Sequence, residues 1–276
     1  MIRFAKYHAL GNDYLVISPE WLEIQLSPAL IQHICHRHHG VGSDGILLGP
    51  LETSEADFGL RIFNPDGSQA EKSGNGLRIF ARWLWDQGKV QEKPFSIWTP
   101  GGIVTATVHP GGDVVTVAMG QASFDSALIP VTGMRRQVVD ESLNITGIEL
   151  RYCAITLGNP HCVVLHPPAL AEEARLWGPL IEADPRFPHR TNVQFLEVLD
   201  RKNLRIEIWE RGAGYTLASG SSSCVAAAAA FRLGLCESQV QVHNPGGILE
   251  VAISPDYHLT LTGPVSRVAE GFFFDR

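Results

Sequence analysis

The 276-residue sequence predicts an α+β fold in which an internal duplication forms two pseudo-symmetric domains. Two observations support this prediction. First, three stretches of the first half recur in order in the second half, namely residues 11–17 with 158–164, 62–76 with 208–222, and 100–103 with 245–248. Second, the longest match places Ser73-Gly74 and Ser219-Gly220 at the start of a predicted helix in each half. We therefore expect one domain over residues 1–118 and another over 119–264, with a C-terminal strand at 265–276 completing the first.

The first half combines short strand patterns with two helices. Residues 4–17 place apolar residues on both sides of a turn-forming cluster, which predicts a strand, a turn and a strand. Residues 27–39 predict a helix, because Ser27 is a favoured N-cap residue, a proline follows it and a glycine ends the pattern. After Gly76, apolar residues at helical spacing predict a second helix that ends at Gly88. Shorter strand patterns and glycine-rich turns lie at 45–48, 59–63, 100–102 and 110–112.

The second half repeats this plan. Residues 225–233 predict a helix, and the five alanines from Ala226 to Ala230 allow it to be buried closely among strands. Gly234 ends this helix. Residues 167–190 are rich in proline and charge, which predicts a helical excursion and loops on the surface. Strand patterns follow around turns at 245–247 and 255–256.

Composition narrows the classes of function. A hydrophobic content of 45% with 18% charged residues is typical of a globular protein. The net charge is −7 and no block of Lys or Arg stands out, which argues against a nucleic-acid partner. No apolar run reaches the roughly 18 residues of a membrane span, and the N-terminus lacks a signal peptide. An odd number of scattered cysteines predicts free thiols and a cytoplasmic location, and they are Cys35, Cys153, Cys162, Cys224 and Cys236.

The paired Ser-Gly turns are the strongest candidates for chemistry. One such pair has a simple structural explanation, since serine is a favoured N-cap and glycine tolerates turn geometry. Two pairs at equivalent places favour a functional role, because helix N-termini present backbone N–H groups and the positive end of the helix dipole. If both turns meet across a cleft, they can hold an anion such as a substrate carboxylate. Asparagines in the neighbouring turns can be turn formers or hydrogen-bond partners of a zwitterion.

Seven motifs, taken in order, resemble those of the diaminopimelate epimerase family. They are Gly11-Asn12-Asp13, Gly40-Val41-Gly42-Ser43-Asp44-Gly45, Phe63-Asn64-Pro65-Asp66-Gly67-Ser68, Gly74-Asn75-Gly76, Gly158-Asn159-Pro160-His161, Thr191-Asn192-Val193 and Trp209-Glu210-Arg211-Gly212-Ala213-Gly214. The resemblance spans almost the whole chain. It implies two similar domains, each a curved, mostly antiparallel sheet wrapped around a central helix. It also implies an isomerase that inverts an amino-acid α-carbon by 1,1-proton transfer between two opposed side chains, with neither PLP nor metal as cofactor.

The resemblance also assigns site residues. Ser73 and Ser219 match the two acid/base positions. The substrate-contacting positions are matched by Asn12, Asn64, Asn159, Asn192, Glu210 and Arg211, and the helix-start amides that hold the α-carboxylate by Gly74, Asn75, Gly220 and Ser221.

The chain departs from the family at both acid/base positions, where the family has cysteine and this chain has Ser73 and Ser219. A serine hydroxyl is a much weaker acid than a thiol, so proton abstraction is expected to be slow unless a neighbouring base assists. Glu210, His161 and His8 are the candidate helpers.

Other positions depart as well. Tyr215 stands where the family usually has an acidic residue, and Ser222-Ser223 replace a typical Gly-Ala. This spread of changes favours natural divergence over deliberate replacement of the two cysteines. Because Tyr215 lies beside the second site, a changed pocket for the substrate side chain is also expected. Tyr215 and His161 are the candidate auxiliary residues.

A cluster of Cys35, His36, His38 and His39 can be read as a metal site or as a histidine-rich helix end. We favour the helix end, because the helix dipole favours histidine there and no further ligand lies nearby in sequence. No metal site is expected.

The sequence thus predicts a diaminopimelate epimerase-like isomerase acting on a small amino acid. Two alternatives stay open: a proton-shift isomerase with another small acid as substrate, and an amino-acid-binding pseudoenzyme. The family resemblance also implies a homodimer, for which the residues themselves indicate no interface.

Overall fold

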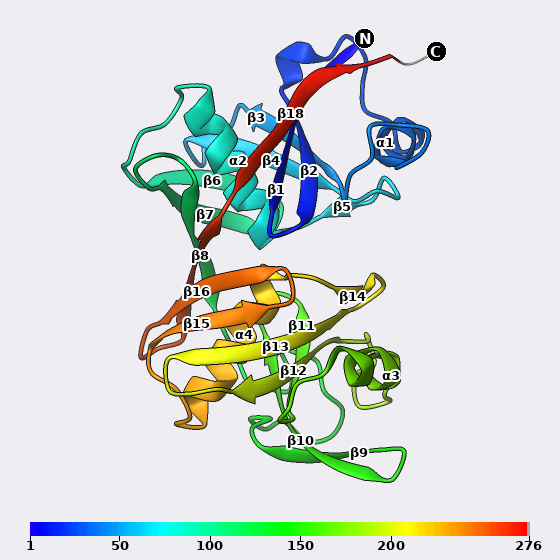
Figure 1. Cartoon of the computed structure of the whole chain (residues 1–276), viewed down its shortest axis with the longest axis vertical. Helices are drawn as coiled ribbons and strands as arrows, with labels where there is room; N and C mark the ends of the chain where they lie inside the picture. The colour runs from blue at the N-terminus through cyan, green and yellow to red at the C-terminus, as the bar shows by residue number, and fades with distance from the viewer. Residues whose placement is uncertain (275–276) are drawn as a thin grey trace. The chain divides into compact units, whose positions relative to one another are not determined.

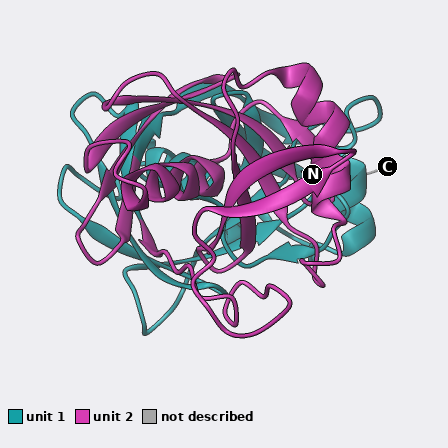
Figure 2. Cartoon of the chain, turned by 90° about the horizontal axis from the view of Figure 1, so that it is seen from below, with its two compact units in different colours: residues 1–118, 262–276 teal, residues 119–261 magenta. Residues whose placement is uncertain are grey.

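The computed structural model describes residues 1–274, so residues 275–276 of the expected C-terminal strand lie outside the described part. The chain divides into two compact units (Figure 2): unit 1 comprises Met1–Ala118 with Thr262–Arg276, and unit 2 comprises Met119–Leu261. The chain passes from one unit to the other within β8 (Val114–Gln121) and again within β17 (His258–Pro264). No helix in residues 1–274 is long and apolar enough to cross a membrane.

Unit 1 is built mainly of strands with two α-helices. In chain order these are β1 (Ile2–Ala9), β2 (Asn12–Ile17), α1 (Pro28–Cys35), β3 (Ile46–Leu51), β4 (Phe58–Phe63), β5 (Gln69–Ala70), α2 (Gly74–Asp86), β6 (Phe95–Thr99), β7 (Gly102–Val108), β8 and, at the C-terminus, β18 (Ser266–Phe273). A short 3-10 turn, Pro19–Trp21, follows β2. The C-terminal strand β18 pairs antiparallel with β1.

Unit 2 follows with the same types of element. In chain order these are β9 (Glu141–Ile145), β10 (Ile148–Thr156), β11 (Pro160–Leu165), α3 (Ala171–Glu182), β12 (Asn192–Val198), β13 (Asn203–Glu210), β14 (Gly214–Thr216), α4 (Gly220–Arg232), β15 (Gln239–Asn244), β16 (Gly247–Ile253) and β17.

The two units repeat one order of strand pairings. In unit 1, β1–β2 is antiparallel, β2–β3 parallel, β3–β4 and β4–β5 antiparallel, β4–β6 parallel and β6–β7 antiparallel. In unit 2, the pairs β10–β11, β11–β12, β12–β13, β13–β14, β13–β15 and β15–β16 follow the same sequence of directions. The predicted duplicated α+β fold is therefore confirmed.

Each unit encloses one helix (Figure 1). Helix α2 packs against β1, β2, β3 and β7, and α4 packs against β10 to β13, β15 and β16. The residues predicted for the buried face of α2, such as Leu77 and Phe80, are fully buried. All five alanines from Ala226 to Ala230 are also fully buried, which confirms that small side chains let α4 lie close to its strands.

Two local predictions need adjustment. The helix expected over residues 27–39 ends at Cys35, because the backbone turns at His36 and the N–H groups of Val41 and Gly42 donate to the carbonyl of Ile34. The region 167–190 does contain a helix, α3, but this helix is not only a surface feature. Its Trp177 and Ile181 are buried in the core of unit 2.

Candidate functional site

The two serines singled out by the sequence occupy equivalent N-caps. Ser73 caps α2 with φ −144° and ψ 119°, and Ser219 caps α4 with φ −141° and ψ 125°. The Oγ of Ser73 accepts a hydrogen bond from the N–H of Gly76 at 3.0 Å, and that of Ser219 accepts from the N–H of Ser222 at 3.4 Å. Each oxygen therefore faces backbone donors and the positive end of a helix dipole, which favours negative charge on it. Because each serine oxygen is the acceptor in its capping bond, its hydroxyl hydrogen takes no part in that bond and can be donated to another group.

Tyr14 lies beside Ser73 in unit 1. Its Oη is 3.4 Å from the Oγ of Ser73, and its side chain is buried. Gly45 makes room for the ring, since a Cβ at that position would lie 2.7 Å from Cε1 of Tyr14. The sequence reasoning missed Tyr14, although the repeat held the signal, because Tyr14 aligns with His161 when Gly11-Asn12 is matched to Gly158-Asn159.

A chain of hydrogen bonds orders the amides of unit 1. The buried Arg78 donates to Oδ1 of Asn75 at 2.8 Å, and Nδ2 of Asn75 donates to Oδ1 of Asn12 at 3.0 Å. Nδ2 of Asn12 then donates to Oδ2 of Asp44 at 2.9 Å. The chain runs from a cation to a carboxylate, so the orientation of both asparagine amides is set. Two predicted substrate contacts, Asn12 and Asn75, are thereby brought together.

Charged side chains surround the carboxylate end of this chain. Arg37 donates to Asp44 at 2.6 Å and to Asp13 at 2.8 Å, and Lys6 lies 2.7 Å from Asp13. Burial alone would raise the pKa of Asp13, but the hydrogen bonds from Arg37 and Lys6 lower it below its ordinary value. Arg37 is therefore held by two carboxylates, Asp13 on β2 and Asp44 just before β3.

Two further predicted residues of unit 1 have local partners. Nδ2 of Asn64 donates to Oγ of Ser68 at 3.0 Å within the turn between β4 and β5. Nδ1 of His8, one of the candidate helper bases, accepts from the N–H of Gly11 at 3.3 Å.

A buried polar network connects Asn159 to the start of α4 in unit 2. Nε2 of His161 lies 3.0 Å from Oδ1 of Asn159, and Nδ1 of His161 lies 3.2 Å from Nε2 of Gln194. Nε2 of Gln194 also donates to Oγ of Ser222 at 3.0 Å. Burial lowers the pKa of His161 to about 3, so its ring is neutral. Both ring nitrogens have partners, which leaves His161 without the geometry of a base for Ser219.

Asn192 and Arg211 meet next to this network. Oδ1 of Asn192 accepts from the backbone N–H of Arg211 at 3.0 Å, and its Nδ2 donates to the carbonyl of Pro160 at 2.9 Å. The guanidinium of Arg211 is exposed and donates to the carbonyl of His189 at 3.0 Å. Asn192 thus links the end of β13, where Glu210 and Arg211 lie, to β11.

Tyr215 has its own partners on the outer part of unit 2. Its hydroxyl donates to Glu207 at 2.5 Å, and the guanidinium carbon of Arg175 lies 3.8 Å from its ring centre. Burial and the hydrogen bond to Glu207 raise the pKa of Tyr215 to about 12. The hydroxyl is therefore protonated at neutral pH.

The helix starts place the other predicted residues. Gly74 and Gly220 begin α2 and α4 and are buried, and Oγ of Ser221 lies 3.5 Å from Oγ of Ser219. Backbone N–H groups in the first turn of a helix have no partner within the helix. The four helix-start residues therefore offer backbone donors beside each serine.

The cysteines and the histidine cluster around His36 have ordinary structural surroundings. All five cysteines are buried and none is in a disulfide, and burial raises the pKa of Cys153 and of Cys236 to about 11. Nδ1 of His36 accepts from the N–H groups of His38 and His39 at 3.1 Å, as a turn would. Within residues 1–274, no three His, Cys, Asp or Glu side chains are grouped as metal ligands would be.

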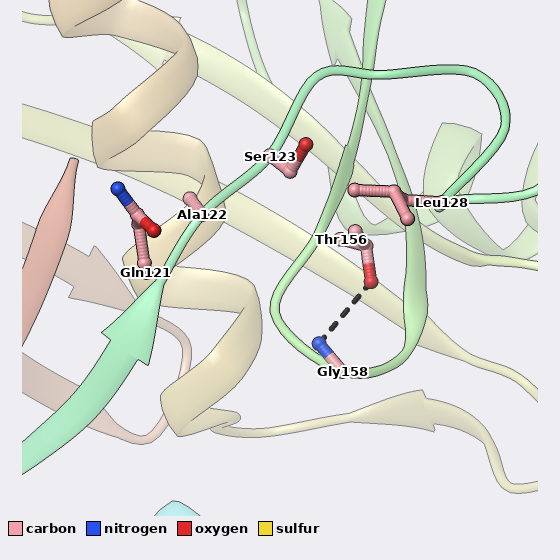
Figure 3. A pocket seen from close by; sticks show the side chains of 6 residues that line it. All are labelled: Gln121, Ala122, Ser123, Leu128, Thr156 and Gly158. Carbon is pink, nitrogen blue, oxygen red and sulfur yellow. Dashed lines mark hydrogen bonds between the residues drawn. The ribbon is translucent and has the colours of Figure 1, made fainter. Parts of the chain in front are cut away.

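A surface cavity of about 510 Å³ opens in unit 2 (Figure 3). It is lined by Gln121, Ala122, Ser123, Leu128, Thr156 and Gly158. The Thr156 hydroxyl accepts from the N–H of Gly158 at 3.1 Å and so shapes the turn before Asn159. None of the predicted site residues lines this cavity, so it does not define the candidate site.

Comparison with known sequences gives a consistent answer. The family model for diaminopimelate epimerase matches residues 4–125 and 153–268. Diaminopimelate epimerase 2 of Nostoc sp. is 57% identical over 270 residues, which cover 98% of this chain and 95% of that protein. Diaminopimelate epimerase of Moorella thermoacetica is 38% identical over 277 residues, which cover 99% of each chain.

Solved structures with little sequence similarity share the fold. A hydroxyproline epimerase from Agrobacterium vitis, with trans-4-hydroxy-L-proline bound, superposes with a TM-score of 0.71 at 16% identity, covering 98% of this chain and 91% of that one. A methylitaconate Δ-isomerase superposes with a TM-score of 0.65 at 14% identity, covering 99% and 95%. The sequence relatives carry the assignment further than the fold does: the chain belongs to the diaminopimelate epimerase family of isomerases.

Proposed function

We propose that the chain epimerises an amino acid by 1,1-proton transfer at the α-carbon, with diaminopimelate as substrate and with neither PLP nor metal. The observation that carries this proposal is the matched pair of serine N-caps, Ser73 and Ser219, whose backbone dihedrals agree within a few degrees. The relatives named diaminopimelate epimerase support the choice of substrate.

The proposed reaction uses one serine as base and the other as acid. One serine, in its alkoxide form, takes the α-proton on Oγ and becomes a hydroxyl, and the electron pair of the C–H bond stays on the α-carbon and its carboxylate. The other serine then gives its hydroxyl proton to the opposite face of the same carbon and is left as the alkoxide. The N–H groups of Gly76 and Ser222 stabilise the negative charge that each oxygen carries in turn.

The helix-start amides are the proposed carboxylate site. Backbone N–H groups at Gly74 and Asn75, and at Gly220 and Ser221, favour an anion for the same reason that helix N-termini bind phosphate and carboxylate. Holding the α-carboxylate there also stabilises the carbanion, since its charge spreads onto the carboxylate oxygens.

The remaining predicted residues are the proposed contacts of the substrate's polar groups. Asn12, Asn64, Asn159 and Asn192 offer neutral donors and acceptors. Glu210 and the exposed guanidinium of Arg211 offer opposite charges, which suit the ammonium and carboxylate of a zwitterion.

Serine in place of cysteine makes a slow enzyme the expected outcome. A thiol at a helix N-terminus ionises near neutral pH, whereas a serine hydroxyl does not. We infer that the N-cap hydrogen bonds, and the Tyr14 hydroxyl beside Ser73, supply what activation these oxygens have.

We also propose a cytoplasmic location and a homodimer. The five cysteines, none of them in a disulfide, support the first, because oxidising compartments favour paired cysteines. The second stays a prediction from the family resemblance.

Proton NMR in D₂O tests the proposed function. The protein is incubated with LL-diaminopimelate and with a panel of other L-amino acids. Loss of one α-proton signal, abolished in Ser73→Ala, is the expected result and identifies the substrate. Binding without exchange would show an amino-acid-binding protein, and exchange only with another small acid would show a different isomerase.

A further inference from the structure

The polar network behind Asn159 is built from other side chains than the hydrogen-bonded chain behind Asn12 in unit 1, although the repeat provides the equivalent positions. The parallel pairing of β2 with β3 and of β11 with β12 aligns Leu47 with Gln194. The helix starts align Gly76 with Ser222. Leu47 packs against Gly76, with its Cδ2 3.0 Å from the place of a Cβ, whereas Gln194 donates to Ser222 at 3.0 Å. The pair of positions that makes an apolar contact in unit 1 thus makes a hydrogen bond in unit 2.

The hydrogen bonds of this network have a direction. Nε2 of Gln194 uses its two hydrogens on Oγ of Ser222 and Nδ1 of His161. Nδ1 is therefore the acceptor of the neutral ring, and the proton lies on Nε2, which donates to Oδ1 of Asn159 at 3.0 Å. Oε1 of Gln194 is then the one buried atom of the network with no partner among residues 1–274. If the Gln194 amide were flipped, its NH₂ group would lie where Oε1 now lies and would be buried with two N–H donors that have no acceptor. That arrangement is less favourable than one carbonyl oxygen without a donor.

We propose that His161, Gln194 and Ser222 are positioning residues that hold the amide of Asn159 with its oxygen turned inward and its NH₂ group turned away from His161. Asn159 is then a donor toward ligand, and it selects an acceptor such as a substrate carboxylate oxygen over an ammonium group. This proposal rests on the proposed function, which makes Asn159 a substrate contact.

Burial keeps this arrangement constant with pH. His161, Gln194 and Ser222 are all fully buried, and the pKa of His161 lies far below neutral. Protonation of Nδ1 would displace the Gln194 donor, so a neutral ring is the form that the network requires. The direction of the Asn159 amide is therefore set in the protein before ligand binds.

Nitrogen NMR tests the direction without any turnover. Protein labelled with ¹⁵N-histidine is compared with the His161→Gln variant, which identifies the His161 signals. We expect Nε2 protonated and Nδ1 unprotonated, unchanged from pH 5 to pH 8. A proton on Nδ1, or titration of His161 in this range, would overturn the proposal even if the enzyme proves active.

Variants test the consequence for the ligand. His161→Gln keeps one donor and one acceptor, whereas His161→Leu keeps neither. We expect His161→Leu to raise KM for LL-diaminopimelate roughly 5- to 10-fold with kcat within about twofold, since one neutral hydrogen bond is misdirected. His161→Gln should retain most of the wild-type KM. A fall in kcat with KM unchanged would instead make His161 a base and overturn the proposal.

A second experiment places the two residues of unit 1 at the equivalent positions of unit 2. Gln194→Leu with Ser222→Gly installs the pair that unit 1 already packs, so the double variant is expected to fold and to raise KM as His161→Leu does. The control Tyr152→Phe removes another, partly buried hydrogen bond of unit 2, from Tyr152 to Glu141 at 3.2 Å, and should leave KM unchanged. An unchanged KM in the double variant would contradict the proposal.

Calorimetry separates the two proposals. The dissociation constant of diaminopimelate should change between wild type and each variant by the same factor as KM. The role of Asn159 can therefore be tested even if the protein turns over no substrate. If no α-proton exchange is seen but the dissociation constants change as expected, the proposed reaction is wrong and the positioning role of the network stands.

Discussion

The N-terminus of α2 and the N-terminus of α4 share one backbone conformation and differ in the side chains around it. At α2, Arg78 and Asp44 end a hydrogen-bonded chain of asparagines, so the amides lie between a cation and a carboxylate. At α4, the neutral His161 and Gln194 do the equivalent work in a buried site. Both units have a serine N-cap of the same backbone conformation, while the polar side chains around it differ. We infer that the two serines are equivalent in position and unequal in electrostatic environment.

Removing either serine hydroxyl should have the largest effect. Ser73→Ala and Ser219→Ala each remove one acid/base group, so kcat should fall by roughly 10²- to 10⁴-fold. Each change also removes an N-cap, which should lower the free energy of unfolding by about 1 kcal/mol. Steady-state kinetics and urea denaturation measure the two effects separately.

Ser27→Ala is the matched control for this experiment. Ser27 caps α1 by accepting from the N–H of Leu30 at 3.2 Å and lies outside the proposed site. It should lose similar stability with no change in kcat. Equal losses of activity in all three variants would mean that the serines act as caps alone.

Restoring cysteine should change the rate in the other direction. In Ser73→Cys/Ser219→Cys, both thiols sit at helix N-termini that favour the thiolate, so kcat should rise on the order of 10²-fold. The single variants sharpen the comparison, because unequal surroundings predict unequal gains. A double variant no faster than wild type would show that the rest of the site is not built for this chemistry.

The pH dependence of stability tests the buried ring of unit 2. His161 has a folded-state pKa of about 3 and an unfolded-state pKa of about 6.5, so the unfolded chain binds the additional proton below pH 6.5. Stability should therefore fall as the pH is lowered from 6.5. Between pH 7.5 and pH 5, wild type should lose about 2 kcal/mol more than His161→Gln, in which this proton is absent. If urea denaturation shows that wild type and His161→Gln lose the same free energy of unfolding over this pH range, His161 is in contact with water in the folded protein.

The smallest effect is expected at Tyr14. Its hydroxyl lies 3.4 Å from Oγ of Ser73, which is longer than a strong hydrogen bond. Tyr14→Phe keeps the ring that Gly45 accommodates and should lower kcat roughly three- to tenfold. Kinetics with Tyr152→Phe as control, at a buried tyrosine outside the proposed site, would show whether any buried tyrosine hydroxyl has the same effect.

Local patterns predicted most of the fold, because duplication made each half a check on the other. The glycine-rich turns, the Ser-capped helices and the alanine run of α4 all specify structure over a few residues. The early end of α1 could not be predicted in the same way, since it depends on Val41 and Gly42, beyond the helix, turning back to donate to the carbonyl of Ile34.

The site was less accessible to sequence reasoning. The motifs pointed to Ser73, Ser219 and the asparagines, but they gave no partners for these side chains. From its motif, His161 is a candidate base for Ser219. Its burial and its hydrogen bonds to Asn159 and Gln194, which only the structure shows, place both ring nitrogens against other partners. Tyr14 was missed because its role depends on the fold bringing β2 to the start of α2.

Exchange of the α-proton in D₂O tests the central claim most directly, which is that two serine N-caps transfer protons at one carbon. With LL-diaminopimelate, wild type should lose the signal of one α-proton and form a product that carries deuterium at that carbon, while Ser73→Ala and Ser219→Ala should not. Undiminished exchange in both alanine variants, or bound ligand without exchange in wild type, would contradict the account.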